Sequence, residues 1–143
     1  MGKCYNTIVV NAPVEKVWST VRDFHDLSWA KGVVEKTEIV GELKGDQVGA
    51  KRILNDAFHE TLRTLSDLNY LVEYSIEDGP GPVAKDQVRN YTGHVQLYSV
   101  TADNSTFVEW TSKYDSPDNA AVSELCDPIY VALLQALRAH FGG

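Results

Sequence analysis

Hydrophobic and polar residues alternate with a period of two along most of the chain between residues 33 and 114. The clearest case is the segment 70–77, in which Tyr70, Val72, Tyr74 and Ile76 alternate with mostly polar neighbours. This period is typical of a β-strand with one covered face and one solvated face. The pattern predicts strands over residues 33–42, 49–54, 58–65, 70–77, 88–100 and 107–114, and the β-forming residues 4–10 predict one more.

Residues 13–21 have the period of a helix instead. Pro13 suits the first turn, because the N–H group that proline lacks would have no partner there. One apolar stripe along this helix consists of Val14, Val17, Trp18 and Val21. A second short helix is predicted over Leu27 to Trp29, before Gly32.

The last segment of the chain is also helical, with a broad apolar face. Pro128 interrupts this pattern and leaves two interpretations open. Either one long helix kinks at Pro128, or Asp127 caps a separate helix that has Pro128 at its first position. The apolar face consists of Val122, Leu125, Cys126, Ile129, Tyr130, Leu133, Leu134, Leu137 and Phe141.

The predicted strands follow one another directly, and the helices do not alternate with them. This order excludes a parallel, doubly wound sheet. It predicts an α+β fold, in which an antiparallel sheet of about seven strands carries helices on one face. The 143 residues contain no repeat and no linker, so we expect a single domain over residues 1–143, with a core that needs no disulfide.

The formal net charge of -7 disfavours a nucleic-acid or membrane-surface role, because phosphate groups would repel the chain. No apolar stretch approaches the roughly 20 residues that a membrane span needs. The two cysteines, Cys4 and Cys126, are too few for a disulfide framework. We therefore expect a cytoplasmic monomer or homodimer with two free thiols, without membrane insertion and without a nucleic-acid partner.

The alternation also assigns side chains to the two faces of the predicted sheet. If Tyr74 points inward, the preceding strand places Phe58 and Glu60 inward, and a hairpin around Asp56 pairs Arg52 with Glu60 on the same face. A buried ion pair is costly and therefore indicates a role in a binding site. The other interpretation is that the pair only connects two strands.

Wide aromatic side chains share this inward face. Tyr74, Tyr91 and Trp110 all fall on the inward phase of their strands. Aromatic walls that surround a few polar groups are typical of a small-molecule pocket. Together with the ion pair, they predict a ligand that is mainly apolar and carries at least one polar oxygen.

An ordered set of short motifs extends through the whole chain. It consists of Ala12-Pro13, Val17-Trp18, Asp23-Phe24, Trp29, Gly49-Ala50 with Arg52, Glu60 with Leu62, Tyr74, Asn90-Tyr91 and Glu109-Trp110. In these motifs the chain resembles the polyketide cyclase/dehydrase-type branch of the START-like (SRPBCC) superfamily, which includes the major birch-pollen allergen and plant hormone receptors. The resemblance implies a helix-grip fold: a curved antiparallel sheet around a long C-terminal helix, with two short helices after the first strand.

The same resemblance implies that a cavity between sheet and helix binds an apolar small molecule, such as a lipid, a polyketide or an aromatic ligand. Asn90 also matches the family pattern, although the alternation points it outward. The candidate ligand-binding residues are Trp29, Arg52, Glu60, Tyr74, Tyr91, Trp110, Cys126 and Tyr130.

The alternative function is a cyclase or dehydratase-like enzyme, in which Glu60 is the general base and either Arg52 or Tyr74 stabilises an enolate oxygen. A neighbouring arginine lowers the pKa of a carboxylate and so opposes the role of Glu60. The sequence contains no nucleophile elbow, phosphate loop or dinucleotide motif, and its four histidines are scattered, so neither a cofactor nor a metal site is predicted. A third function, binding to protein partners, would require apolar side chains on the outer sheet face, where we expect mostly charged ones.

Overall fold

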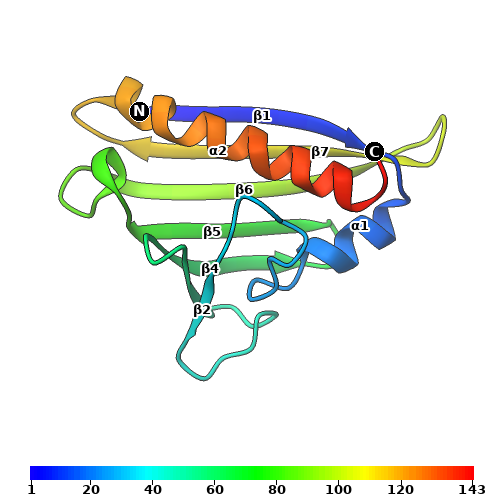
Figure 1. The fold of residues 1–143 in the computed structure, drawn as a ribbon, viewed down its shortest axis with the longest axis horizontal. Coiled ribbons are helices and arrows are strands. Elements are labelled where there is room, and N and C mark those ends of the chain that lie inside the picture. Colours follow the sequence, from blue (N-terminus) through cyan, green and yellow to red (C-terminus); the bar gives the residue numbers. More distant parts are fainter.

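Seven antiparallel strands form one sheet in the computed structural model, which describes residues 1–143. Their spatial order is β1-β7-β6-β5-β4-β3-β2, so the first strand lies beside the last (Figure 1). This arrangement confirms the predicted antiparallel α+β fold. The strands are β1 (Gly2–Val10), β2 (Thr37–Val40), β3 (Lys51–Leu54), β4 (Phe58–Ser66), β5 (Leu71–Asp78), β6 (Arg89–Val100) and β7 (Ser105–Asp115).

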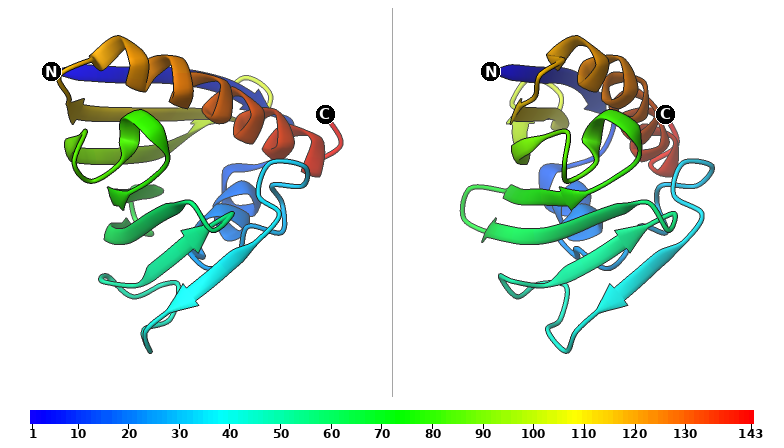
Figure 2. Two further views of the ribbon diagram at one scale, coloured as in Figure 1. Left: turned by 60° about the vertical axis from the view of Figure 1, so that its left-hand side comes forward. Right: turned by 90° about the vertical axis from the view of Figure 1, so that its left-hand side faces the viewer.

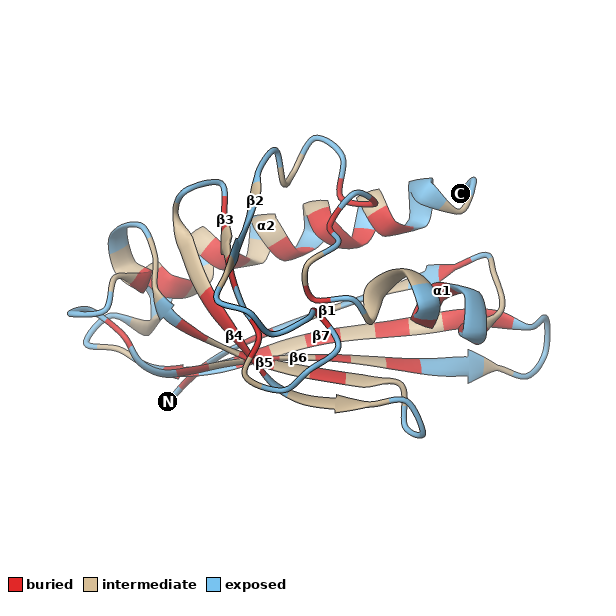
Figure 3. Cartoon of the chain, turned by 90° about the horizontal axis from the view of Figure 1, so that it is seen from below, coloured by how far each residue is buried: buried red, intermediate tan, exposed pale blue.

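Two α-helices pack on the same side of this sheet (Figure 3). The short helix α1 (Val14–Val21) follows β1, and the long helix α2 (Asn119–His140) follows β7 and lies along β1. The direction of the strands turns progressively from β1 to β2, so the sheet curves around α2 (Figure 2). The arrangement is the helix-grip fold that the sequence motifs predict. A single turn of 3₁₀ helix, η1 (Gly81–Val83), lies in the connection between β5 and β6.

Helix α2 is continuous through Pro128, which decides between the two interpretations of this residue. Asp118 caps the helix by accepting a hydrogen bond from the backbone N–H of Ala121, whereas the Asp127 side chain accepts one from Asn6 in β1. Pro128 and Glu124 both lie on the exposed face of α2. Pro128 has no N–H group to bond the carbonyl of Glu124, and a proline at an exposed position leaves water as a partner for that carbonyl.

By length and composition alone, α2 could span a membrane, with a mean hydropathy of 1.3 over its most apolar window. A helix that packs in the core of a protein passes the same test. The buried side chains of α2 face the sheet, among them Val122, Tyr130 and Leu137. The composition of α2 is therefore weak evidence for a membrane span.

The predicted second helix over Leu27 to Trp29 is wrong, because this segment forms a series of turns. The carboxylate of Asp26 accepts a hydrogen bond from the backbone N–H of Ser28, and Asp23 accepts one from His25. Such local bonds between side chains and backbone compete with helix formation.

The strand predicted over residues 33–42 is shorter in the structure, where β2 begins at Thr37. The reason is a contact that is distant in sequence. The side chain of Asn55 accepts hydrogen bonds from the backbone N–H groups of Glu35 and Lys36 and donates one to the carbonyl of Val33. These backbone groups are therefore not available for strand pairing.

The assignment of side chains to the inner face is confirmed on five strands, β3 to β7. The row along β7 also extends further than predicted, to Thr106 and Tyr114, which are both buried. The predicted residues that are buried on the inner face are Arg52, Leu54, Glu60, Leu62, Val72, Tyr74, Ile76, Tyr91, Val95, Leu97, Val108, Trp110 and Ser112.

The outer face of the sheet is less polar at one end than we expected. Val9 lies beside Phe107 on the neighbouring strand, and Phe107 lies beside Tyr98, with 6.2 Å between the two ring centroids. Val9 and Tyr98 are each half exposed. Polar residues cover the middle of the same face, including the contact between His94 and Glu73. Val9, Phe107 and Tyr98 thus form a small apolar cluster at one end of the outer face.

Candidate functional site

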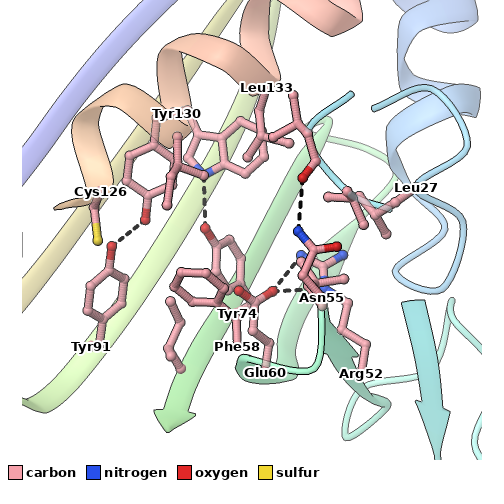
Figure 4. A pocket seen from close by; sticks show the side chains of 16 residues that line it. Leu27, Arg52, Asn55, Phe58, Glu60, Tyr74, Tyr91, Cys126, Tyr130 and Leu133 are labelled. Carbon is pink, nitrogen blue, oxygen red and sulfur yellow. Dashed lines mark hydrogen bonds and ion pairs between the residues drawn. The ribbon is translucent and has the colours of Figure 1, made fainter. Parts of the chain in front are cut away.

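A cavity of about 130 Å³ lies between α2 and the inner face of the sheet (Figure 4). Thirteen of its sixteen lining residues are hydrophobic, and the polar ones are Arg52, Asn55 and Glu60. Helix α2 contributes the wall that contains Cys126, Ile129, Tyr130 and Leu133. Strands β3 to β7 contribute the opposite wall, because their inward rows face the helix.

Arg52 and Glu60 form the predicted ion pair on one side of this cavity. They are direct partners in the register of β3 and β4, and both side chains are less than a tenth exposed. Oε1 of Glu60 accepts a hydrogen bond from Nε of Arg52 at 2.8 Å, and Nη2 of Arg52 lies 2.7 Å from the same oxygen in the ion pair. The turn at Asn55 and Asp56 sets this register, since both residues adopt the left-handed backbone conformation that tight hairpins require.

Arg52 has further partners that hold its guanidinium in place. Its Nη1 donates to the backbone carbonyl of Phe24 at 2.9 Å, and its guanidinium carbon lies 3.8 Å from the centroid of the Phe24 ring. Glu60 has no partner besides Arg52, so its second oxygen, Oε2, accepts no hydrogen bond from the protein. Burial raises the pKa of Glu60, although the charge of Arg52 opposes this effect.

Aromatic hydroxyl groups are linked in pairs around the cavity. The indole Nε1 of Trp110 donates to the hydroxyl of Tyr74 at 2.9 Å. The hydroxyls of Tyr91 and Tyr130 are hydrogen-bonded to each other, and Tyr91 also donates to Oγ of Ser112 at 3.3 Å. Burial raises the pKa of all three tyrosines, so they are neutral at physiological pH. These links hold the aromatic walls rigid.

Cys126 completes the wall on the helix side of the cavity. Its thiol is buried, which raises its pKa to about 11. A thiol with this pKa is protonated at neutral pH and has little nucleophilic character. Cys126 therefore behaves as a small apolar group in this wall.

The structure brings together all the candidate ligand-binding residues except one. Trp29 is buried, but it lines a separate void of about 30 Å³ on the other side of Arg52 and Tyr74. Asn90 is exposed on the outer face, as the alternation predicts, and donates to Asp115. The family pattern therefore misplaces Asn90, and Trp29 supports the core beside the cavity without facing it.

The sequence analysis missed the residues at the rim of the cavity. Val33, Val34 and Leu27 belong to the segment between α1 and β2, and Asn55 fastens this segment to the β3–β4 turn. Lys36 and Asp56 add an exposed ion pair at 2.7 Å. Asn55 could have been found from its place in a tight turn, where asparagine favours a positive φ angle. No sequence signal indicates which distant backbone it contacts.

No three His, Cys, Asp or Glu side chains come together in a way that would hold a metal ion. The polar groups of the cavity are one ion pair, one amide and the linked hydroxyls. This set offers hydrogen bonds and a single carboxylate that could accept a proton.

Solved structures similar to this chain share its fold over nearly the whole length. A protein from Nitrosospira multiformis is 44% identical, with a TM-score of 0.94 over 97% of this chain and 95% of that one. The Bacillus cereus protein XoxI is 23% identical, with a TM-score of 0.80 over 99% of this chain and 96% of that one. A Thermobifida fusca protein is 24% identical, with a TM-score of 0.82 over 99% of this chain and 94% of that one.

None of the curated proteins compared with the chain matches it. The model of one family, described as polyketide cyclase / dehydrase and lipid transport, matches residues 1–142. This match covers the sheet, both helices and every residue of the cavity. The chain therefore belongs to the polyketide cyclase / dehydrase and lipid transport family, an SRPBCC-type family, as its ordered motifs predict.

Proposed function

We propose that this protein binds an apolar small molecule, about the size of one aromatic ring, in the cavity between α2 and the sheet. The observation that carries this proposal is a cavity of about 130 Å³ with aliphatic and aromatic walls. An engineered cavity of about 150 Å³ with similar walls holds a benzene molecule. A ligand of this size gains binding free energy because it moves apolar surface out of water.

The size of the cavity favours a ring-sized ligand over a lipid or a polyketide chain. The volume of about 130 Å³ is close to that of a cavity that holds a single benzene molecule. A longer ligand would need the rim at Val33 and Val34 to move away from α2. The hydrogen bonds of Asn55 oppose this movement.

Titration of ¹⁵N-labelled protein with toluene tests the proposal. We expect chemical-shift changes for amides around the cavity, with saturation. Ile129→Phe fills the cavity from α2 and should weaken binding at least about tenfold, because the added ring occupies the space of the ligand. Val131→Phe is the matched control, since Val131 lies on the same helix but is 41% exposed and faces away from the cavity. Equal binding by the two variants, or no shift changes in the parent protein, would refute the proposal.

A second candidate function is catalysis of a cyclisation or dehydration, with Glu60 as the general base. One observation favours it: burial raises the pKa of Glu60, and its Oε2 is free to accept a proton. Arg52 would then stabilise the negative charge that develops on a carbonyl oxygen of the substrate. Turnover of a poly-carbonyl probe that survives Glu60→Gln unchanged would exclude this function.

We also propose a cytoplasmic location. Cys4 and Cys126 are both free and buried. Free thiols persist in a reducing compartment.

A further inference from the structure

The carboxylate of Glu60 is bound on one side only. Its hydrogen bond from Nε of Arg52 and its ion-pair contact with Nη2 both end on Oε1, and no protein group donates to Oε2. The side chain is only 6% exposed and lines the cavity (Figure 4). No buried side-chain oxygen of the protein lacks a hydrogen-bond partner, so Oε2, which has none, must keep accessible surface. Oε2 is thus an acceptor that the fold leaves open toward the cavity.

The other polar groups around the cavity already have partners within the protein. The hydroxyl of Tyr74 accepts from Trp110, and the hydroxyls of Tyr91 and Tyr130 are bonded to each other. Arg52 donates to Glu60 and to a backbone carbonyl. Oε2 of Glu60 is therefore the charged acceptor that is available to a ligand.

We propose that the natural ligand is a neutral, ring-sized molecule that donates an O–H or N–H hydrogen bond to Oε2 of Glu60, as a phenol does. This inference rests on the proposed function, and it adds the chemical class of the ligand. A neutral ligand is favoured because Arg52 and Glu60 together carry no net charge. An anionic ligand would be repelled by Oε2, and a cationic one would leave a net charge buried in an apolar cavity.

Three probes of similar size separate the contributions of ring and donor. Phenol has a ring and an O–H donor, anisole has a ring and an oxygen that only accepts, and toluene has the ring alone. Dissociation constants come from amide shift changes in the ¹⁵N-labelled protein at pH 7. We expect phenol to bind about tenfold or more tightly than anisole, the effect of one hydrogen bond to a charged acceptor.

Glu60→Gln should reverse this preference. Arg52 donates a hydrogen bond to Oε1 from Nε and brings Nη2 within 2.7 Å of it, so it will hold the amide oxygen of glutamine there. The amide NH₂ group then replaces Oε2, and the acceptor becomes a donor. The ratio of the anisole to the phenol dissociation constant should fall at least about tenfold. Glu73→Gln is the matched control, because Glu73 lies on the outer face and contacts His94. It should leave the ratio unchanged.

The possible results distinguish this inference from the proposed function. If none of the probes binds the parent protein, both are wrong. If toluene and anisole bind as tightly as phenol, the cavity binds rings but Oε2 does not select a donor, and only this inference fails. The same conclusion follows if Glu60→Gln folds, as judged by its thermal melting, and keeps the ratio of the parent. If Glu60→Gln does not fold, the three probes with the parent protein decide.

Discussion

Replacing Gly93 with alanine places a methyl group where the ring of Tyr74 now lies. Gly93 in β6 is the direct partner of Tyr74 in β5, and the ring of Tyr74 packs against Gly93. A Cβ atom at Gly93 would lie 2.1 Å from Cζ of Tyr74 and 2.5 Å from its hydroxyl oxygen. Tyr74 cannot move freely, because it is buried beside Phe24 and hydrogen-bonded to Trp110.

The expected loss of stability follows from three contributions. Overpacking of a core typically costs about 1–3 kcal/mol. Displacement of the ring would also break the hydrogen bond between Trp110 and Tyr74, at a cost of about 1 kcal/mol. Alanine restricts the unfolded chain more than glycine does, and this effect stabilises the folded protein by about 0.4–1 kcal/mol. The net effect should be a loss of about 2 kcal/mol in the free energy of unfolding.

Urea denaturation followed by tryptophan fluorescence measures this loss. For a slope of about 2 kcal/mol per molar urea, the midpoint should fall by about 1 M. Gly79→Ala is a suitable control, since a Cβ atom there would meet its neighbours only at 3.4 Å. In a Tyr74→Ala background, Gly93→Ala should cost nothing, because the ring that it contacts is absent. A stability of Gly93→Ala equal to that of Gly79→Ala would refute the reasoning.

Three further predictions concern the ion pair, the rim and the thiols. Burial raises the pKa of Glu60 above the 4.5 of the unfolded chain, so the folded protein binds more protons than the unfolded one above pH 4.5. The free energy of unfolding of the parent, measured relative to that of Glu60→Gln by urea denaturation, should therefore fall as the pH rises from 4.5. A difference that stays constant or grows with pH would contradict this. Asn55→Gly keeps the positive φ angle but removes three hydrogen bonds, so it should lower the free energy of unfolding by about 1–3 kcal/mol. Hydrogen exchange at the amide of Lys36 should become faster. Unchanged exchange would show that Asn55 does not hold the rim. Cys4 and Cys126 are buried, and the raised pKa of each thiol keeps it protonated, so neither should react with Ellman's reagent at pH 8 before the protein unfolds; immediate reaction of one thiol equivalent would show that a cysteine is accessible.

Much of the sheet could be predicted because its signal is local. The period of two determines which side chains share a face, and the short turn at Asn55 and Asp56 determines the register of Arg52 and Glu60. The errors occurred where a side chain forms hydrogen bonds with backbone groups that a strand or a helix would otherwise use. Asn55 shortens the strand expected from Val33, and Asp26 ends the helix expected at Leu27.

The candidate site could be predicted only in part for a similar reason. Alternation indicates that Tyr74 and Trp110 point inward, but it does not indicate whether a side chain meets open space or another side chain. Trp29 illustrates the difference, since it is buried as expected and yet lines a separate small void. The continuity of α2 through Pro128 also depends on solvent contact along one face of the helix, which the sequence does not specify.

By itself, the sequence determined the order of the strands, the side chains on each face of the sheet and the pairing of Arg52 with Glu60. Each of these follows from a repeat or a turn within a few residues of chain. Only the tertiary structure decided the volume of the cavity, the residues at its rim and the oxygen of Glu60 that stays open. These depend on how closely α2 approaches the curved sheet, and that distance results from packing among side chains that are far apart in the chain.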